Sequence, residues 1–136
     1  MKGLVFVFFV FLSGLTYSQA NPVSWSIDSN KDTVEITATI ETGWKIYASG
    51  LDPSIGPVPT SIFIKTPSCA MDWINPEPKK MFDNNFQSEV LYWNETVSFV
   101  SKERCNKKGE LVFEVEYMAC NKKTCLPPAL ITLTSK

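Results

Sequence analysis

The sequence of 136 residues predicts an all-β protein, an immunoglobulin-like antiparallel β-sandwich spanning residues 21–136. In several short segments, apolar and polar residues alternate strictly, which is the period of a strand with one buried face. Turn-forming residues separate these segments, and no window has a convincing helical period. About eight short strands in this length fit one domain with a single core.

The clearest alternation occurs in three segments. Residues 34–40 alternate valine, isoleucine and alanine with glutamate or threonine. In residues 111–117, leucine, valine and aromatic residues recur at every second position against Glu114 and Glu116, and residues 130–134 repeat the same period. Shorter runs rich in β-branched and aromatic residues complete the predicted set of strands, namely Val23–Ile27, Trp44–Ala48, Thr60–Thr66, Glu89–Trp93 and Thr96–Val100.

Turn signals lie between these runs, at residues 29–32, 42–43, 83–85 and 106–109. The segment Gly50–Pro59 holds three prolines, which lack a backbone donor, so it is expected to be an ordered loop at one end of the sandwich rather than a central strand. Residues 67–87 are expected to be a second irregular stretch, although they contain three aromatic side chains.

The first 20 residues have the pattern of a removable secretory signal peptide. Lys2 precedes an apolar run over Gly3–Leu15, and small residues at Ser18 and Ala20 suit cleavage after Ala20. The alternative is an uncleaved membrane anchor, although a full span needs about 20 apolar residues. In both cases residues 21–136 are expected to be exported.

Charge and composition exclude several classes of function. Residues 21–136 carry 12 basic and 14 acidic side chains, and this near-neutral balance argues against a nucleic-acid partner. The chain has no histidine, which removes Ser-His-Asp and Cys-His catalysis and histidine-ligated metal or haem. No metal or other cofactor is expected, and no apolar run after Ala20 is long enough for a membrane span.

The four cysteines, Cys69, Cys105, Cys120 and Cys125, are candidates for disulfides in an exported chain, and three pairings are open. A Cys69–Cys105 bridge closes a long loop and would stabilise the fold by about 3.8 kcal/mol on the chain-entropy model. A Cys120–Cys125 bridge closes a short loop and would contribute about 2.2 kcal/mol. The first pairing therefore suits a structural role better than the second.

A Cys120–Cys125 bridge requires the intervening residues to turn back as a four-residue hairpin loop. That bridge would lie at a loop tip, within reach of another protein's thiol. Lys122 and Lys123 would favour a thiolate on either cysteine, or they are simply the solvated tip of the hairpin. Zinc is disfavoured because only this pair approaches the usual ligand spacing. No thioredoxin-type C-x-x-C occurs, so the domain is not expected to be a thioredoxin-like enzyme itself.

Three segments resemble the N-terminal periplasmic domain of the DsbD family, the bacterial transmembrane thiol:disulfide interchange reductases. Residues 115–128 resemble its active-site segment, a strand that ends in an aromatic residue followed by cysteine, a polar loop, a second cysteine and a Pro-Pro pair. Residues 43–47 resemble a Gly-aromatic-x-Leu-Tyr strand of that family, and residues 83–90 resemble its cap-loop region. The similarity extends over essentially all of residues 21–136.

The resemblance implies an immunoglobulin-like domain that accepts electrons from a membrane thiol reductase domain and passes them to thioredoxin-like periplasmic proteins. Cys120 and Cys125 would be the redox pair, with Cys125 forming the mixed disulfide and Cys120 resolving it. Phe86 best matches the capping aromatic, with Phe82 as second choice, and further residues implied to line the site are Trp44 and Tyr47. For Phe86 and Tyr47, ordinary core packing is the alternative role.

This sequence departs from the family pattern at two points. Four residues separate Cys120 from Cys125 where five are expected, and Cys69 and Cys105, which have no expected counterpart, are interpreted as an added structural disulfide. The family's membrane reductase domain and C-terminal thioredoxin-like domain are also missing from this sequence, so a chain that stops at Lys136 is expected to receive its electrons from a separate protein or to serve another purpose on the same scaffold. The competing hypothesis is a non-catalytic exported binding domain with two structural disulfides, using the proline-rich loop Leu51–Thr60 and exposed aromatics as its binding face.

Overall fold

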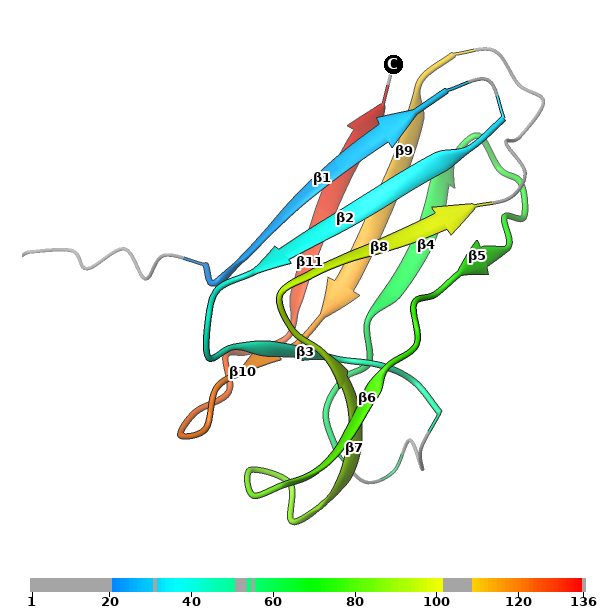
Figure 1. Ribbon diagram of the computed structural model, residues 1–136. Helices are drawn as coiled ribbons and strands as arrows, with labels where there is room; N and C mark the ends of the chain where they lie inside the picture. The colour runs from blue at the N-terminus through cyan, green and yellow to red at the C-terminus, as the bar shows by residue number, and fades with distance from the viewer. Residues whose placement is uncertain (1–20, 31, 51–53, 55, 102–108, 136) are drawn as a thin grey trace, which may run out of the picture.

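The computed structural model describes residues 21–30, 32–50, 54, 56–101 and 109–135. This part of the chain contains strands, turns and loops but no helix, and thus no helix that could cross a membrane. Its strands form three antiparallel sheets (Figure 1). In chain order the strands are β1 (Val23–Ser29), β2 (Val34–Ile40), β3 (Lys45–Tyr47), β4 (Ser61–Thr66), β5 (Trp73–Ile74), β6 (Lys79–Asp83), β7 (Ser88–Trp93), β8 (Thr96–Ser101), β9 (Leu111–Tyr117), β10 (Ala119–Cys120) and β11 (Ala129–Ser135).

Two of the sheets face each other as a sandwich, with strand orders β1-β2-β8-β5 and β11-β9-β4. Figure 1 shows the first sheet lying across the second. The core between them is apolar and takes at least one side chain from most of these strands. The predicted immunoglobulin-like sandwich is therefore confirmed.

The alternation in the sequence becomes alternation in burial. Every second residue of β2 and β9, beginning with Val34 and Leu111, is apolar and 0–5% exposed, whereas the residues between them are half-buried or exposed. In β11 the inward positions are Ile131 and Leu133, which pack on the core, while Leu130 points outward and is 61% exposed. Strands β2 and β9 thus bury the apolar face of their alternating sequences.

The third sheet, ordered β10-β3-β7-β6, lies at one end of the sandwich (Figure 1). It is continuous with the sandwich because β7 runs into β8 through Asn94 and Glu95, and β9 runs into β10 through Met118. The left-handed backbone of Glu95, with φ of 66°, makes the first connection tight, and the Glu95 carbonyl accepts a hydrogen bond from the Ile40 amide. We call this third sheet and its two hairpin tips, residues 84–87 and 121–124, the cysteine end.

The structure corrects one prediction about the strands. Residues 67–87, expected to be irregular, contain β5 and β6. Strand β6 pairs with β7 along its full length, but it exposes Phe82 and buries Asp83, so its sequence lacks the usual apolar alternation. The predicted leader, residues 51–53, Ile55 and Cys105 lie outside the described residues, and the described remainder of Gly50–Pro59 contains no strand.

Candidate functional site

The cysteine end takes its name from a disulfide between Cys120 and Cys125. The two residues face each other across a hairpin, and their Cα atoms are 4.1 Å apart. Hydrogen bonds flank them on both sides, from the Asn121 amide to the Thr124 carbonyl and from the Leu126 amide to the Ala119 carbonyl, each 2.9 Å. The cysteines therefore form a non-hydrogen-bonded pair, the position where facing antiparallel residues come closest.

The tip of this hairpin is held by a side chain of its own sequence. Asn121 Oδ1 accepts hydrogen bonds from the backbone amides of Lys123 and Thr124, both at 2.8 Å. Asparagine is favoured in turns because its side chain can satisfy amides two or three residues further on. Lys122, Lys123 and Thr124 are consequently displayed on the outside of a fixed turn.

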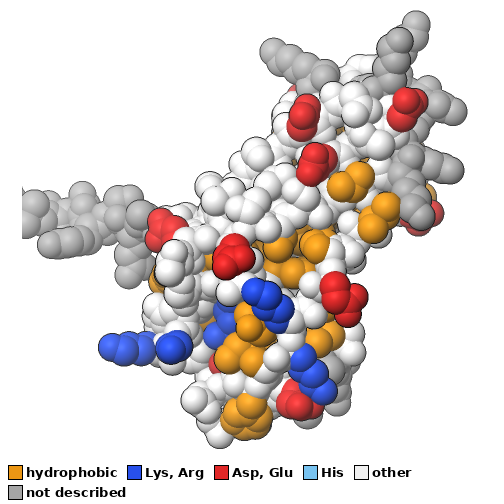
Figure 2. Space-filling model, viewed as in Figure 1, with side chains coloured by type: hydrophobic (Ala, Val, Ile, Leu, Met, Phe, Trp, Pro, Cys, Tyr) orange, Lys and Arg blue, Asp and Glu red, His pale blue; other side chains and the backbone are white. Residues whose placement is uncertain are grey.

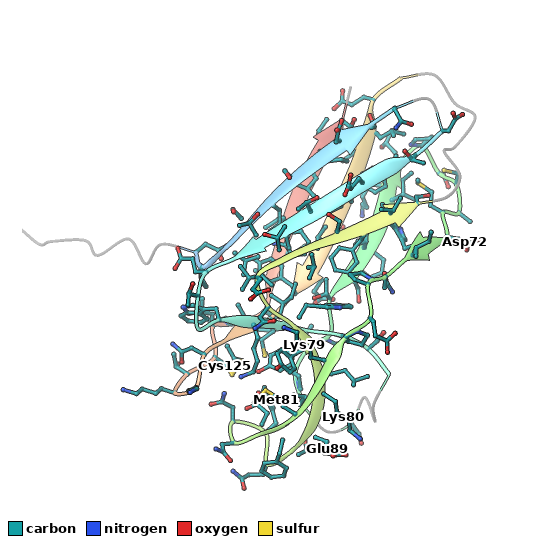
Figure 3. The ribbon with its side chains drawn as sticks, in the orientation of Figure 1. Asp72, Lys79, Lys80, Met81, Glu89 and Cys125 are labelled. Carbon is teal, nitrogen blue, oxygen red and sulfur yellow. A yellow bond between two sulfur atoms is a disulfide. The ribbon has the colours of Figure 1, made fainter. Side chains whose placement is uncertain are left out.

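The two sulfur-bearing residues differ in exposure. Cys120 is fully buried and Cys125 is only partly buried. A small cluster, separate from the main core, surrounds them: Tyr47 and Val90 are its other fully buried members, with Met81, Phe86, Tyr92 and Met118 packed at its edge. Figure 3 labels Cys125 on the hairpin and Met81 on the opposing strand β6.

The turn between β6 and β7, residues 84–87, lies against this cluster. Its Phe86 ring meets the Tyr47 ring edge to face, with centroids 5.6 Å apart and an interplanar angle of 83°. The turn is closed by a 3.2 Å hydrogen bond from the Phe86 amide to the Asp83 carbonyl. It also contacts the disulfide hairpin, because Asn85 Nδ2 donates to the Asn121 carbonyl at 3.0 Å. We call residues 84–87 the cap turn.

A buried carboxylate links the cap turn to the strand beneath the disulfide. Asp83 Oδ2 accepts a hydrogen bond from the Tyr47 hydroxyl at 2.8 Å and lies 3.1 Å from Lys45 Nζ. Asp83 Oδ1 accepts from the Asn85 amide at 2.8 Å. Lys45, in turn, is the cross-strand neighbour of Cys120. Both charged groups are nearly inaccessible, so removal of either one would leave the other as an uncompensated buried charge.

The electrostatics of this network fix its protonation. Burial, followed by the hydrogen bond and the negative charge of Asp83, raises the pKa of Tyr47 well above its ordinary value. Burial alone would raise the pKa of Asp83, but the hydrogen bonds from Tyr47, Asn85 and Lys45 outweigh it and lower that pKa below 3.8. At neutral pH, Tyr47 is therefore a neutral hydrogen-bond donor and Asp83 an anion.

A hollow of about 230 Å³ lies beside the hairpin. It is lined by Asn21, Tyr117, Ala119, Leu126, Pro127 and Ala129. Leu126 and Ala119 are the chain neighbours of Cys125 and Cys120, so the hollow adjoins the disulfide. Among the described residues, no three histidine, cysteine or carboxylate side chains come together as a metal site.

The structure brings some of the candidate residues together and leaves others elsewhere. Phe86 and Tyr47 lie with the cysteines, while Trp44 packs on the main core and Phe82 is 55% exposed. Cys69 is disulfide-bonded, but Cys105 lies outside the described residues, so their pairing stays a prediction.

The sequence interpretation assigned no role to Lys45 or Asp83. Lys45 lies in the segment 43–47 and Asp83 in the segment 83–90, and nothing in the sequence indicates that the two side chains meet.

Together these features define a class of protein: an immunoglobulin-like sandwich that carries a disulfide hairpin at one end, beneath an aromatic cap. Residues 14–134 match the family model described as "Thiol:disulfide interchange protein DsbD, N-terminal". The chain therefore belongs to this family of DsbD N-terminal domains, as the resemblance in the sequence implied.

Solved structures agree on the fold. The reduced N-terminal domain of DsbD from Neisseria meningitidis has a TM-score of 0.65 at 10% identity, covering 84% of each chain. The N-terminal periplasmic domain of ScsB from Proteus mirabilis has a TM-score of 0.60 at 16% identity, covering 82% of this chain and 43% of that one. A structure of the complex between the DsbD and PilB N-terminal domains of N. meningitidis has a TM-score of 0.59 at 10% identity, covering 86% and 87%. None of the curated proteins matches this chain.

Proposed function

We propose that this chain is a periplasmic thiol:disulfide exchange domain that transfers reducing equivalents through Cys120 and Cys125. The observation that carries the proposal is the disulfide between these residues, formed across a hairpin tip with one cysteine buried and the other partly accessible. The membership of the chain in the DsbD N-terminal family supports the same chemistry.

The exchange proceeds in two balanced steps. In the reduced domain, the Cys125 thiolate attacks a disulfide of the partner, which forms a mixed disulfide and releases one partner thiolate. The Cys120 thiolate then attacks Cys125 Sγ, which closes the Cys120–Cys125 disulfide and releases the second partner thiolate. Two electrons pass to the partner, and the released thiolates take up protons from water.

The difference in burial supports this division of roles. An intermolecular attack requires an accessible sulfur, and Cys125 is the more exposed of the two residues. Cys120 is fully enclosed by Tyr47, Val90 and their neighbours, so it is suited to an intramolecular step. The spacing across the hairpin keeps it next to Cys125 throughout.

The cap turn restricts access to the disulfide. Phe86 packs in the cluster that holds both cysteines, and Asn85 is hydrogen-bonded to the hairpin itself. A partner that reaches Cys125 displaces this turn, whereas a small oxidant or thiol meets it closed. Trp44 packs on the main core and contributes to this site only indirectly.

The partners are thioredoxin-like periplasmic proteins on one side and a membrane thiol reductase domain on the other. The complex of a DsbD N-terminal domain with a PilB N-terminal domain supports protein partners for this fold. A periplasmic location is supported by the leader-like residues 1–20 and by the similarity to a periplasmic domain of ScsB.

A redox titration of the purified protein tests the proposal. The protein is equilibrated in glutathione or dithiothreitol buffers, the thiols are alkylated, and mass spectrometry identifies the modified cysteines. Cys120 and Cys125 are expected to titrate together at a potential above about −300 mV, the upper range of resistant structural bridges. The Cys69→Ser/Cys105→Ser double variant is the matched control and should retain this transition.

A second arm tests the division of roles. The Cys120→Ser variant is expected to accumulate a mixed disulfide on Cys125, because the resolving thiol is missing. The Cys125→Ser variant should form far less, since its remaining thiol is buried. If neither cysteine is reduced until the protein unfolds, the exchange proposal fails and the domain is a binding module held by structural disulfides.

A further inference from the structure

Charge is distributed unevenly between the two parts of the molecule. The seven strands of the sandwich sheets carry four carboxylates and one lysine, a net charge of −3. The cysteine end, from β3, β6, β7, β10 and the two hairpin tips, carries five lysines and two carboxylates, a net charge of +3. In Figure 2 the lysine side chains gather over the cysteine end together with some acidic ones, whereas the charged side chains visible over the sandwich are acidic.

Most of the lysines at the cysteine end have a partner within the domain. Lys45 pairs with Asp83, Lys80 lies 2.9 Å from Glu89, and Lys79 donates to Asn94 Oδ1 at 2.7 Å. Lys122 and Lys123 are different, because no described carboxylate lies within ion-pair distance of either one. Both are exposed, so their charge is available to an approaching molecule.

The position of these two lysines is fixed by the site. They occupy the middle of the loop that joins Cys120 to Cys125, and the Asn121 side chain holds that loop in its turn. The hydrogen bond from Asn85 to the Asn121 carbonyl ties the same loop to the cap turn. A molecule whose sulfur reaches Cys125 therefore passes close to two positive charges that form no ion pair with any described carboxylate.

We propose that Lys122 and Lys123 select partners that carry negative charge beside their exchanging cysteines. This inference rests on the proposed function and names the chemistry of the partner, a protein whose disulfide is flanked by aspartate or glutamate. Complementary charge at the rim of a docking surface raises the association rate and disfavours like-charged competitors. Because the lysines are exposed, salt should weaken the effect.

An alternative role for the lysines makes a different prediction. If they acted only by favouring the Cys125 thiolate, their removal would change the reaction with every disulfide in the same proportion. Selection of an acidic partner requires the change to depend on the charge of the partner. The two roles can therefore be separated with disulfides that differ in charge.

The experiment uses the full chain in its reduced form and three small disulfides as probes: 3,3′-dithiodipropionate, bis(2-hydroxyethyl) disulfide and cystamine. Each accepts two electrons from Cys120 and Cys125 and is released as two thiols. Rates are measured by alkylation and mass spectrometry at low and high ionic strength. For each probe the rate of the Lys122→Gln/Lys123→Gln variant is divided by that of the unaltered protein, which cancels differences in leaving group.

The double variant is expected to react about fivefold more slowly with the anionic probe and about equally with the neutral one. It should react faster with the cationic probe, and these differences should shrink at high salt. The Lys122→Glu/Lys123→Glu variant should reverse the preference. The Lys65→Gln variant, altered at an exposed lysine paired with Glu114 on the sandwich, is the matched control and should leave all three rates unchanged.

Equal ratios for all three probes, or no change for any of them, would overturn this inference while leaving the exchange function intact. Because the cap turn restricts small molecules, the three probes are also tested on the Phe86→Ala variant, and a folded Phe86→Ala protein that reduces none of them would overturn both the inference and the proposed function. Circular dichroism and urea unfolding of each variant show that the rates refer to folded protein.

Discussion

The sandwich and the cysteine end are built on opposite principles. The sandwich core is a continuous apolar layer to which most of its strands contribute. The cysteine end contributes Ile46, Trp93 and Ala119 to that core, but its own cluster around the disulfide is small. It also encloses the only charged side chains that are buried in the described part of the chain, Lys45 and Asp83.

The contrast shows that the sandwich provides the stability of the domain and the cysteine end provides its chemistry. An apolar core stabilises the fold but offers no chemistry, whereas a buried ion pair contributes little net stability and holds its neighbours in one arrangement. The sandwich thus acts as a rigid base, and the cysteine end positions the sulfur atoms, the cap turn and the lysines. Four predictions test this division.

The largest effect is expected in the sandwich. Replacement of Phe113 by alanine removes a fully buried ring that packs against Trp73, with centroids 5.7 Å apart, and should lower the free energy of unfolding by about 3–5 kcal/mol. Urea unfolding followed by tryptophan fluorescence measures this change. The matched control is Phe63→Ala on the neighbouring strand β4, where the ring is 49% exposed, and a comparable loss there would contradict the assignment of the core.

The next effect concerns the buried ion pair. Replacement of Asp83 by alanine leaves Lys45 charged and buried and leaves the Tyr47 hydroxyl without its acceptor, at a cost of about 3 kcal/mol. Asp83→Asn keeps an acceptor for the hydroxyl, so it should cost roughly half as much. Hydrogen exchange should show the loss concentrated in the cap turn and β3, and a uniform loss across the sandwich would argue against a local role.

The lowered pKa of Asp83 should make the stability of the protein depend on pH. Because the fold lowers the pKa of Asp83, its contribution is complete above the ordinary value of 3.8 and is lost as pH falls through the lower folded value. The stability difference between the unaltered protein and Asp83→Asn should therefore be constant from about pH 5 to 7 and should shrink below about pH 4. A difference that persists unchanged at pH 2 would show that the charge of Asp83 is not what stabilises the cysteine end.

The smallest change in stability, but a distinct change in reactivity, is expected for the cap turn. Phe86→Ala should cost only about 1 kcal/mol because the ring is half-buried, yet it should let small thiols reduce the disulfide about threefold faster. Phe82→Ala, on the same hairpin but exposed, is the matched control and should leave the rate unchanged. Equal rates in both variants would remove the protective role of Phe86.

The sequence predicted the sandwich better than the cysteine end, and the reason is physical. Strands β2 and β9 bury one face against an apolar core, so their burial repeats every second residue and can be recognised locally. Strand β6 buries Asp83 and exposes Phe82, which is the reverse of that pattern. Its pairing depends on a carboxylate that meets Tyr47, 36 positions away in the chain, and no local signal reveals such a contact.

The candidate site, likewise, could be predicted only where its residues lie in segments with a recognisable sequence pattern. The cysteines, Tyr47 and Phe86 could be singled out because whole segments resembled a known family, and the structure places them in one cluster. Phe82 and Phe86 could not be ranked on geometry from the sequence, since only the turn decides which ring faces inward. Lys45 gained a role only when β3 was seen to pair with β10 opposite Cys120.

The course of β11 has a practical consequence for studying the domain. This strand begins just after the disulfide hairpin and runs along β9 to the far end of the sandwich, where Ser135 pairs with Leu111 and Figure 1 marks the C-terminus. Asn21, by contrast, lines the hollow beside the hairpin. A surface tether or fluorescent label attached after β11 would therefore leave the reactive face open to solution, whereas one attached before β1 would crowd it.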